Sequence, residues 1–111
     1  MNTDNASKLF NTLGAPVRLA IFRLLVKQGG SGMVAGEIAK TLAVSPANLS
    51  FHLKELSHAG LVTSVQEGRF WRYRADLALM LDLVAFLTEE CCADEDNSDC
   101  RRRCSARYTE D

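Results

Sequence analysis

The feature that most constrains the fold is a pair of short amphipathic segments joined by the three-residue turn AVS. The first, VAGEIAKTL at 34–42, repeats its apolar residues at helical spacing. In the second, SPANLSFHLKELSHAG at 45–60, Ser45 and Pro46 are typical of a helix start and Gly60 of a helix end. The pattern therefore predicts two consecutive helices with almost no linker.

Two strand-like runs follow this pair directly. LVTSVQ at 61–66 and FWRYRA at 70–75 are rich in β-branched and aromatic residues, and Glu-Gly-Arg at 67–69 supplies a turn between them. This arrangement predicts a β-hairpin. Two closely joined helices followed at once by a hairpin are typical of a winged helix-turn-helix, in which the hairpin is the wing.

Three further helices are predicted around this unit. SKLFNTL at 7–13 ends at a glycine, and a second apolar-periodic run begins at Pro16 and stops at the pair Gly29-Gly30. After the hairpin, Asp76 can cap LALMLDLVAFLTEE at 77–90. The chain is therefore predicted to be mainly α with a β-hairpin wing, in the order α-α-α-α-β-β-α.

Charge is distributed unevenly along the chain, although the net charge is only −1. Residues 7–75 carry nine Lys and Arg against three Glu, whereas residues 76–111 carry four Arg against ten Asp and Glu. A basic body is expected to face nucleic-acid phosphate. The polar start is not a secretory signal and the longest apolar run is too short to span a membrane, so we expect a cytoplasmic protein without a membrane partner.

In a winged helix-turn-helix the second helix of the pair lies in the DNA major groove. Leu49, Leu53 and Leu56 line one stripe of this helix, and Phe51 points roughly 170° away from the stripe. The outward face can read bases through Asn and Ser, and its Lys can pair with phosphate or guanine. Its aromatic ring can touch a thymine methyl, and wing arginines can reach phosphate or the minor groove. The predicted DNA contacts are Ser45, Ala47, Asn48, Ser50, Phe51, His52, Lys54, Arg69 and Arg72.

Some of these assignments have simpler alternatives. Phe51 can be an exposed apolar residue that only makes a packing contact. His52 lies nearer the inner edge of the helix, where a supporting or phosphate contact competes with base reading. The arginines of the hairpin can belong to a solvated charged strand.

The last predicted helix is apolar on almost every side. Its apolar residues are Leu77, Leu79, Met80, Leu81, Leu83, Val84, Phe86 and Leu87. A small domain cannot bury that whole circumference, so part of the helix is expected to meet a second copy of the chain. A two-fold dimer would present two reading helices to successive half-sites of a double-stranded operator. A single core helix in a monomer is the alternative.

All four cysteines of the chain gather after this helix, at Cys91, Cys92, Cys100 and Cys104. Cytosolic thiols stay reduced, so such a cluster favours metal binding or redox chemistry over disulfides. Three or four thiolates without imidazole favour soft ions, such as trivalent arsenic or antimony, cadmium, zinc or cuprous ion. A cysteine-bearing tail without function is the alternative. We assign residues 1–90 to a DNA-binding and dimerisation domain, and residues 91–111 to a cysteine-rich flexible tail.

Residues 7–90 resemble the arsenic-repressor family of winged-helix metal sensors, also called ArsR/SmtB. The resemblance rests on LGAPVRLAIFRLL, on GEIAKTLAVSPANLSFHLKELSHAGLV, and on EGRFWRYRA running into an apolar helix. It implies a homodimer that represses an operator until an ion binds, with the first and last helices forming the dimer contact. Phe51 stands where relatives often have a basic residue, so the resemblance does not supply the operator sequence.

The resemblance also has departures that concern the ion. The Cys-x-Cys pair of the best-known arsenic members is absent at 34–37, and the last helix lacks the histidine ligands of zinc sensors. Some similar members carry a CC pair at the helix end and a later cysteine, and these respond to trivalent arsenic. The resemblance therefore implies arsenite or antimonite as effector, bound by Cys91, Cys92 and either Cys100 or Cys104.

The predicted function is a transcriptional repressor released from DNA by trivalent arsenic or antimony. The same fold can instead sense cadmium, zinc, an organoarsenical, an oxidant or a persulfide, and some of these need only the Cys91–Cys92 pair. A protein of another class, which binds metal or transfers electrons and uses its winged domain for protein contacts, is a further alternative. An enzyme is not expected, because the chain has no C-x-x-C and no histidine or other base near its cysteines.

Overall fold

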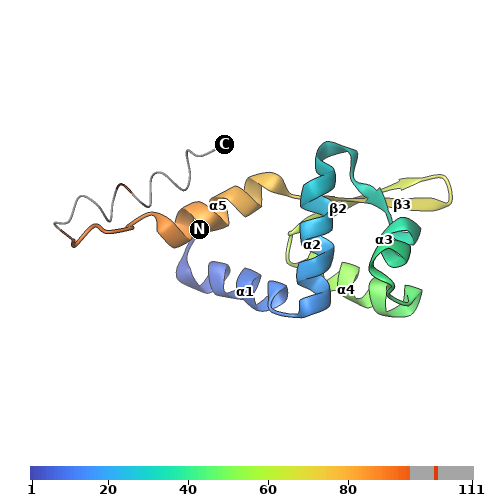
Figure 1. The fold of residues 1–111 in the computed structure, drawn as a ribbon, viewed down its shortest axis with the longest axis horizontal. Coiled ribbons are helices and arrows are strands. Elements are labelled where there is room, and N and C mark those ends of the chain that lie inside the picture. Colours follow the sequence, from blue (N-terminus) through green and yellow to red (C-terminus); the bar gives the residue numbers. More distant parts are fainter. Residues whose placement is uncertain (96–101, 103–111) are drawn as a thin grey trace.

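The computed structural model describes residues 1–95 and Arg102, and within this part the fold is a winged helix-turn-helix (Figure 1). The elements in chain order are α1 (Thr3–Leu13), α2 (Pro16–Gln28), the short 3-10 helix η1 (Gly29–Ser31), β1 (Met33–Val34), α3 (Ala35–Leu42), α4 (Pro46–His58), β2 (Val62–Glu67), β3 (Phe70–Ala75) and α5 (Leu77–Thr88). The predicted mainly α fold with a hairpin wing is confirmed. The predicted tail at 91–111 falls largely outside the described residues.

The helix starts follow from capping side chains in the sequence. The Ser45 hydroxyl accepts a hydrogen bond from the Asn48 N–H at 3.3 Å, and the Asp76 carboxylate accepts one from the Leu79 N–H at 3.0 Å. Both predicted caps are therefore confirmed. Helix α1 begins four residues earlier than the sequence analysis placed it, because the side chain of Asn2 caps the helix there.

A third strand, β1, was not predicted from the sequence. It pairs antiparallel with β3, in the register Met33 with Tyr73 and Val34 with Arg72, so the sheet order is β1-β3-β2. Val34 was expected to open the third helix, which instead begins at Ala35. Gly32 precedes the strand with φ 61°, and a Cβ at this position would clash with the Tyr73 carbonyl. A two-residue strand has no periodicity of its own, because it forms only where a distant strand accepts it.

The core lies between helices α2, α3 and α4 and the inner end of the hairpin. Ile21, Leu25 and Ile38 are fully buried there. The leucine stripe of α4 faces the same core, and burying each leucine contributes about 1.5–3 kcal/mol to stability. This packing fixes which side of α4 points outward.

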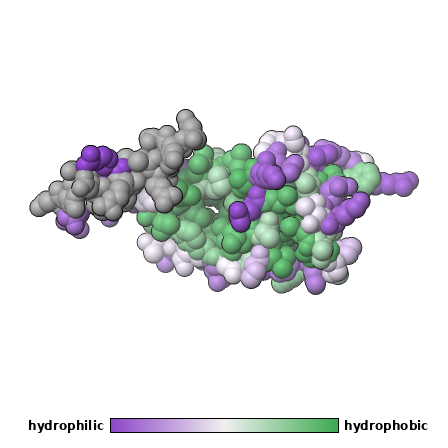
Figure 2. Space-filling view, in the orientation of Figure 1, coloured by the Kyte–Doolittle hydropathy of each residue, from purple (hydrophilic) through white to green (hydrophobic). Residues whose placement is uncertain are grey.

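Helix α5 and the hairpin extend from this body in opposite directions (Figure 1). Of the residues of α5, only Leu83 is buried. Hydrophobic residues gather over α5 on the face that Figure 2 shows, whereas the extreme tip of the hairpin is hydrophilic. Helix α5 therefore leaves four large apolar side chains exposed in a single chain: Leu77, Leu81, Val84 and Leu87.

Among the described residues, no single helix has the length and apolar character needed to cross a membrane. Helices α1 and α2 with η1 meet that test only as a pair, which bends by 98° at its break.

Candidate nucleic-acid interface and cysteine cluster

The outward face of α4 carries most of the predicted base-reading residues. Leu53 and Leu56 are buried on the opposite side, whereas the outward residues are exposed: Ala47, Asn48, Ser50, Phe51 and Lys54. Their exposure follows from the leucine stripe, because a helix that buries positions 49, 53 and 56 turns its opposite side to solvent. The structure therefore gathers an amide, a hydroxyl, an aromatic ring and a cation on one convex surface.

Ser45 combines exposure with a structural role. Its hydroxyl oxygen accepts from the Asn48 N–H, which satisfies one of the free N–H groups at the start of α4. A serine hydroxyl has a donor and a second lone pair besides, so capping leaves it able to donate to a phosphate oxygen.

His52 lies at the inner edge of this face, as the sequence analysis expected. It is half-buried, and its Nδ1 is 3.4 Å from Nη1 of Arg18 on α2. The ring of Phe51 meets the His52 ring edge to face, with centroids 5.3 Å apart and planes at 80°. Phe51 makes this packing contact and still exposes 51% of its surface. The two readings of Phe51, packing and base contact, are therefore compatible.

The arginines of the wing have different surroundings. Arg69 is exposed at the tip of the hairpin. The Arg72 Nε donates to both carboxylate oxygens of Glu67, at 2.9 and 3.1 Å, and its Nη1 donates to the Ser31 carbonyl at 3.0 Å. Arg74, which lies farther in, donates from Nε to the Gly30 carbonyl at 2.7 Å. Arg69 is thus exposed at the tip, whereas Arg72 and Arg74 brace the wing against η1. The DNA contacts of Arg69 and Arg72 both stay predictions.

The sequence analysis did not assign the exposed aromatic residues of the wing to a function. Phe70 exposes 63% of its surface and Trp71 exposes 46%, and Trp71 pairs across the hairpin with Gln66. Side chains alternate along a strand, so Trp71 shares a side of the sheet with the buried Ala75 but lies beyond the core. Two aromatic residues next to the turn, too far from the helices to be buried, were the signal available in the sequence.

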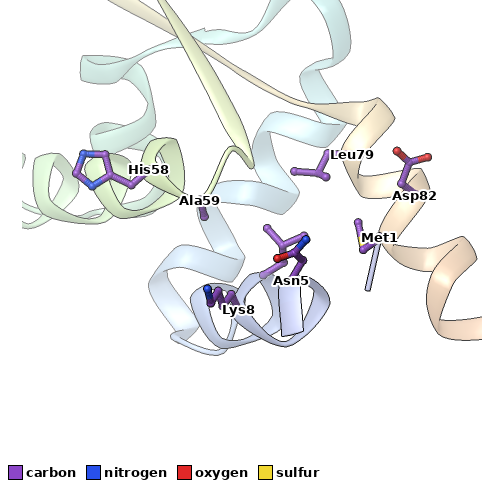
Figure 3. Close-up of a pocket in the computed structure, with 8 residues that line it drawn as sticks. Met1, Asn5, Lys8, His58, Ala59, Leu79 and Asp82 are labelled. Atoms are coloured by element: carbon purple, nitrogen blue, oxygen red, sulfur yellow. The ribbon is translucent and has the colours of Figure 1, made fainter. Parts of the chain in front are cut away.

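A pocket of about 460 Å³ lies where α1, the end of α4 and α5 meet (Figure 3). Asn5 and Lys8 line it from α1, His58 and Ala59 from the end of α4, and Leu79 and Asp82 from α5, together with Met1 and Leu9. His58, which the sequence placed in the last turn of the reading helix, is exposed and lines this pocket from the end of α4. The pocket is separate from the candidate DNA contacts.

The first two cysteines follow α5 after a short turn. The Cys91 N–H donates to the Thr88 carbonyl at 2.9 Å, and the sulfurs of Cys91 and Cys92 are 3.7 Å apart. Both cysteines are disulfide-bonded in this structure, whereas the sequence analysis expected reduced thiols. Their separation is too long for a bond between the two, which requires about 2.05 Å.

Cys100 and Cys104 lie outside the described residues, so the predicted set of four ligands remains a prediction. Within residues 1–95 and Arg102, no three His, Cys, Asp or Glu side chains are close enough together to hold a metal ion.

Residues 13–65 match the helix-turn-helix domain family. An ArsR-like transcriptional regulator from Rhodococcus sp. RHA1 has a similar structure, with a TM-score of 0.68 and 30% sequence identity over 96% of this chain and 94% of that chain. The chain belongs to the ArsR family. ArsR-family proteins are non-enzymatic regulators, so the expectation that the chain is not an enzyme is confirmed.

Two further proteins are similar to this chain over a smaller part of its length. The transcriptional repressor SmtB of Mycobacterium tuberculosis (strain H37Rv) is 40% identical over 91 residues, which are 78% of this chain and 65% of SmtB. The chain therefore spans slightly less than two thirds of this relative. A homodimeric winged helix-turn-helix DNA-binding domain from Mycobacterium bovis has a TM-score of 0.62 and 29% identity, over 78% of this chain and 81% of that one.

Proposed function

We propose that the chain is a dimeric transcriptional repressor that binds double-stranded operator DNA through α4 and the wing. The observation that carries the proposal is the exposed face of α4, where Asn48, Ser50, Phe51 and Lys54 stand opposite a fully buried leucine stripe. The name of the SmtB relative, a transcriptional repressor, and the DNA-binding homodimer from M. bovis support the same function.

Each part of this face suits a different feature of the duplex. The Asn48 amide can donate to and accept from an adenine edge, and Lys54 can bind guanine or phosphate. The Phe51 ring can contact a thymine methyl group. Arg69 at the hairpin tip can reach the phosphates or the minor groove, where it would position the protein without reading sequence.

The uncovered surface of α5 supports a dimer. Leu77, Leu81 and Val84 follow one another at helical spacing along one side and expose 38%, 62% and 37% of their surfaces. Leu87 exposes 66%, and Phe10 of α1 exposes 42%. Two copies that pair through α1 and α5 would cover these side chains and set two α4 helices at a fixed separation.

We propose trivalent arsenic or antimony as the effector, bound by the reduced thiolates of Cys91, Cys92 and either Cys100 or Cys104. The sulfurs of Cys91 and Cys92 are 3.7 Å apart, which suits two thiolates on one soft ion. At a metal–sulfur distance of about 2.3 Å, two thiolates on a tetrahedral ion lie roughly 3.8 Å apart, and two on a pyramidal three-coordinate ion such as trivalent arsenic lie somewhat closer. The pair also stands directly beyond α5, so an ion bound there would act on the dimer helix.

Release from DNA requires that the ion bind the DNA-free conformation more tightly than the DNA-bound one. A coupling of about 1–3 kcal/mol is typical of such regulation and weakens operator binding roughly 5- to 150-fold. Drawing the tail onto the end of α5 would tilt the two reading helices away from their groove spacing.

The experiment begins with reduced protein and a library of random duplexes, from which the bound sequences are selected. Affinity for the selected duplex is then measured by fluorescence anisotropy at several salt concentrations, with and without arsenite. We expect affinity to fall steeply with salt, because phosphate contacts release counterions, and to fall further when arsenite is added. Failure to select any duplex would contradict DNA binding, and an affinity that arsenite leaves unchanged would contradict the effector.

The matched control for the effector is the double variant Cys91→Ser with Cys92→Ser, which should bind the duplex normally and ignore arsenite. Thiol oxidation is a second candidate signal, and loss of operator affinity on treatment with an oxidant in place of arsenite would test it. The variant Cys100→Ser with Cys104→Ser separates the candidates further. A full response in that variant would favour a ligand that needs two thiols, such as an organoarsenical.

A further inference from the structure

The side chain of Arg18 connects its own helix, α2, with two others. It lies in the first turn of α2 and is half-buried. Its Nε donates to the Thr12 carbonyl at the end of α1, at 2.7 Å, and its Nη1 is 3.4 Å from Nδ1 of His52 on α4. The guanidinium therefore connects a helix of the proposed dimer contact with the helix of the proposed DNA contact.

The chemistry of this contact favours one tautomer of the histidine. A guanidinium carries only donors, so the nitrogen that faces it must offer a lone pair. In a neutral imidazole, an acceptor at Nδ1 places the proton on Nε2. A proton on Nδ1 would instead set two donors against each other at 3.4 Å. The Phe51 ring also packs edge to face with this imidazole.

We propose that Arg18 is a positioning residue for the DNA-reading face. It holds His52 in the form that carries its proton on Nε2, and this N–H donates a hydrogen bond to a phosphate oxygen of the operator backbone. The proposal rests on the proposed function and deepens it. Such a bond would set the depth and register of α4 in the groove without reading a base. Because Phe51 packs on the same ring, Arg18 also orients the aromatic contact.

A purely structural role for Arg18 would require only its hydrogen bond to the Thr12 carbonyl, without the contact to His52. The Thr12 carbonyl is one of the last carbonyls of α1, which lack partners within their own helix, and Nε alone satisfies it. A lysine can also satisfy a single carbonyl. Only the planar fork of arginine can serve that carbonyl and His52 together in a fixed geometry. Arg18→Lys therefore keeps the charge while separating the two roles.

The first test uses the free, reduced protein and does not depend on DNA. Long-range ¹H–¹⁵N correlation spectra of the imidazole nitrogens distinguish a proton on Nε2 from one on Nδ1. We expect a single Nε2–H form for His52 in the wild type and a mixture of forms in Arg18→Lys. The second histidine of the chain, His58, lies in the pocket beside α5 and serves as the internal control. A proton on Nδ1 in the wild type, or an unchanged His52 in Arg18→Lys, would overturn the positioning role.

The second test uses the selected duplex and two substitutions of the histidine. A glutamine amide places its nitrogen near the position of Nε2, whereas an asparagine amide reaches only the position of Nδ1. His52→Gln should therefore keep the affinity within about threefold, and His52→Asn and Arg18→Lys should each lose about tenfold, as expected for a hydrogen bond to a charged group. Arg23→Lys, at an exposed position of the same helix, is the control and should bind as the wild type does.

The salt dependence separates positioning from direct contact. If Arg18 acts through the neutral imidazole, Arg18→Gln lowers the affinity and leaves the salt slope unchanged. If Arg18 itself neutralised a phosphate, the slope would fall by about one unit, and that result would overturn the proposal. If the wild type selects no duplex, both the proposed function and the phosphate contact are contradicted. The spectra would still decide whether Arg18 positions His52.

Discussion

Helices α4 and α5 have almost the same length, with 13 and 12 residues, but they differ in how far their apolar side chains are buried. Helix α4 buries all three of its leucines and exposes polar residues with one aromatic ring. Helix α5 buries Leu83 alone and exposes four large apolar residues. The difference shows that α4 is completed by its own chain, whereas α5 needs something outside the chain to cover it.

The exposed faces of the two helices also differ in chemistry, and each suits a different kind of partner. The exposed face of α4 carries hydrogen-bonding groups and a cation, which suit the edges and phosphates of a duplex. The exposed face of α5 is apolar, which suits a second protein surface. Substitutions that act on one helix should therefore leave the other function measurable.

The largest effect is expected for Leu56→Ala, in the stripe of α4. Leu56 is fully buried, and its truncation removes buried methyl groups and leaves a cavity. We expect the free energy of unfolding to fall by about 2–5 kcal/mol, measured by chemical denaturation at one protein concentration. A loss below about 1 kcal/mol would mean that α4 does not depend on this core, and it would contradict the claim that α4 is stabilised by packing within its own chain.

A second large effect is expected for Leu81→Lys on α5. Leu81 exposes 62% of its surface in the single chain, so the charge does not disturb the core. In the proposed dimer the charge would be buried without a partner, and we expect dimer dissociation to become at least about 100-fold more favourable. Sedimentation velocity over a range of concentrations measures this change. Val65→Lys, on the wing at 50% exposure, is the matched control and should leave assembly unchanged.

The parts of the fold that the sequence predicted correctly depend on local chemistry. The caps at Ser45 and Asp76, the leucine stripe and the hairpin are all encoded by residues a few positions apart. The early start of α1 was also readable, since Asn2 is a good cap and Asp4 lies in the first turn. That error came from giving weight to the apolar residues alone.

The parts that the sequence could not predict depend on distant partners. Strand β1 exists because β3, about forty positions later, accepts it. Arg72 and Arg74 donate to carbonyls of η1 that are 41 and 44 positions away, and Arg18 meets His52 across 34 positions. Periodicity and motif spacing carry no information about such contacts. The partners of Arg18, Arg72 and Arg74 could therefore be identified only in the structure.

A smaller effect is expected for Lys54→Ala on the exposed face of α4. The loss of one cation should weaken binding to every duplex by a similar factor and reduce the salt slope by about one unit. Anisotropy measured with the selected duplex and with a scrambled one tests both parts. Lys27→Ala, an exposed lysine of α2, should change neither value. A loss limited to the selected duplex would instead indicate that Lys54 reads a guanine.

The smallest effect is expected for Phe51→Ala, which sharpens the contrast between the two exposed apolar surfaces. Phe51 exposes 51% of its ring and lies on the polar face of α4, so its removal should cost less than about 1 kcal/mol of stability and leave the dimer intact. The loss of a contact with a thymine methyl should weaken the selected duplex by only about three- to fivefold, and replacing that thymine by uracil should remove the difference between wild type and variant. Leu81→Lys should show the reverse pattern: it should weaken the dimer, and its effect should not depend on which duplex is used. If Phe51→Ala shifted the dimer equilibrium instead, the exposed ring would belong to the same kind of surface as α5, and the division of work between the two helices would be wrong.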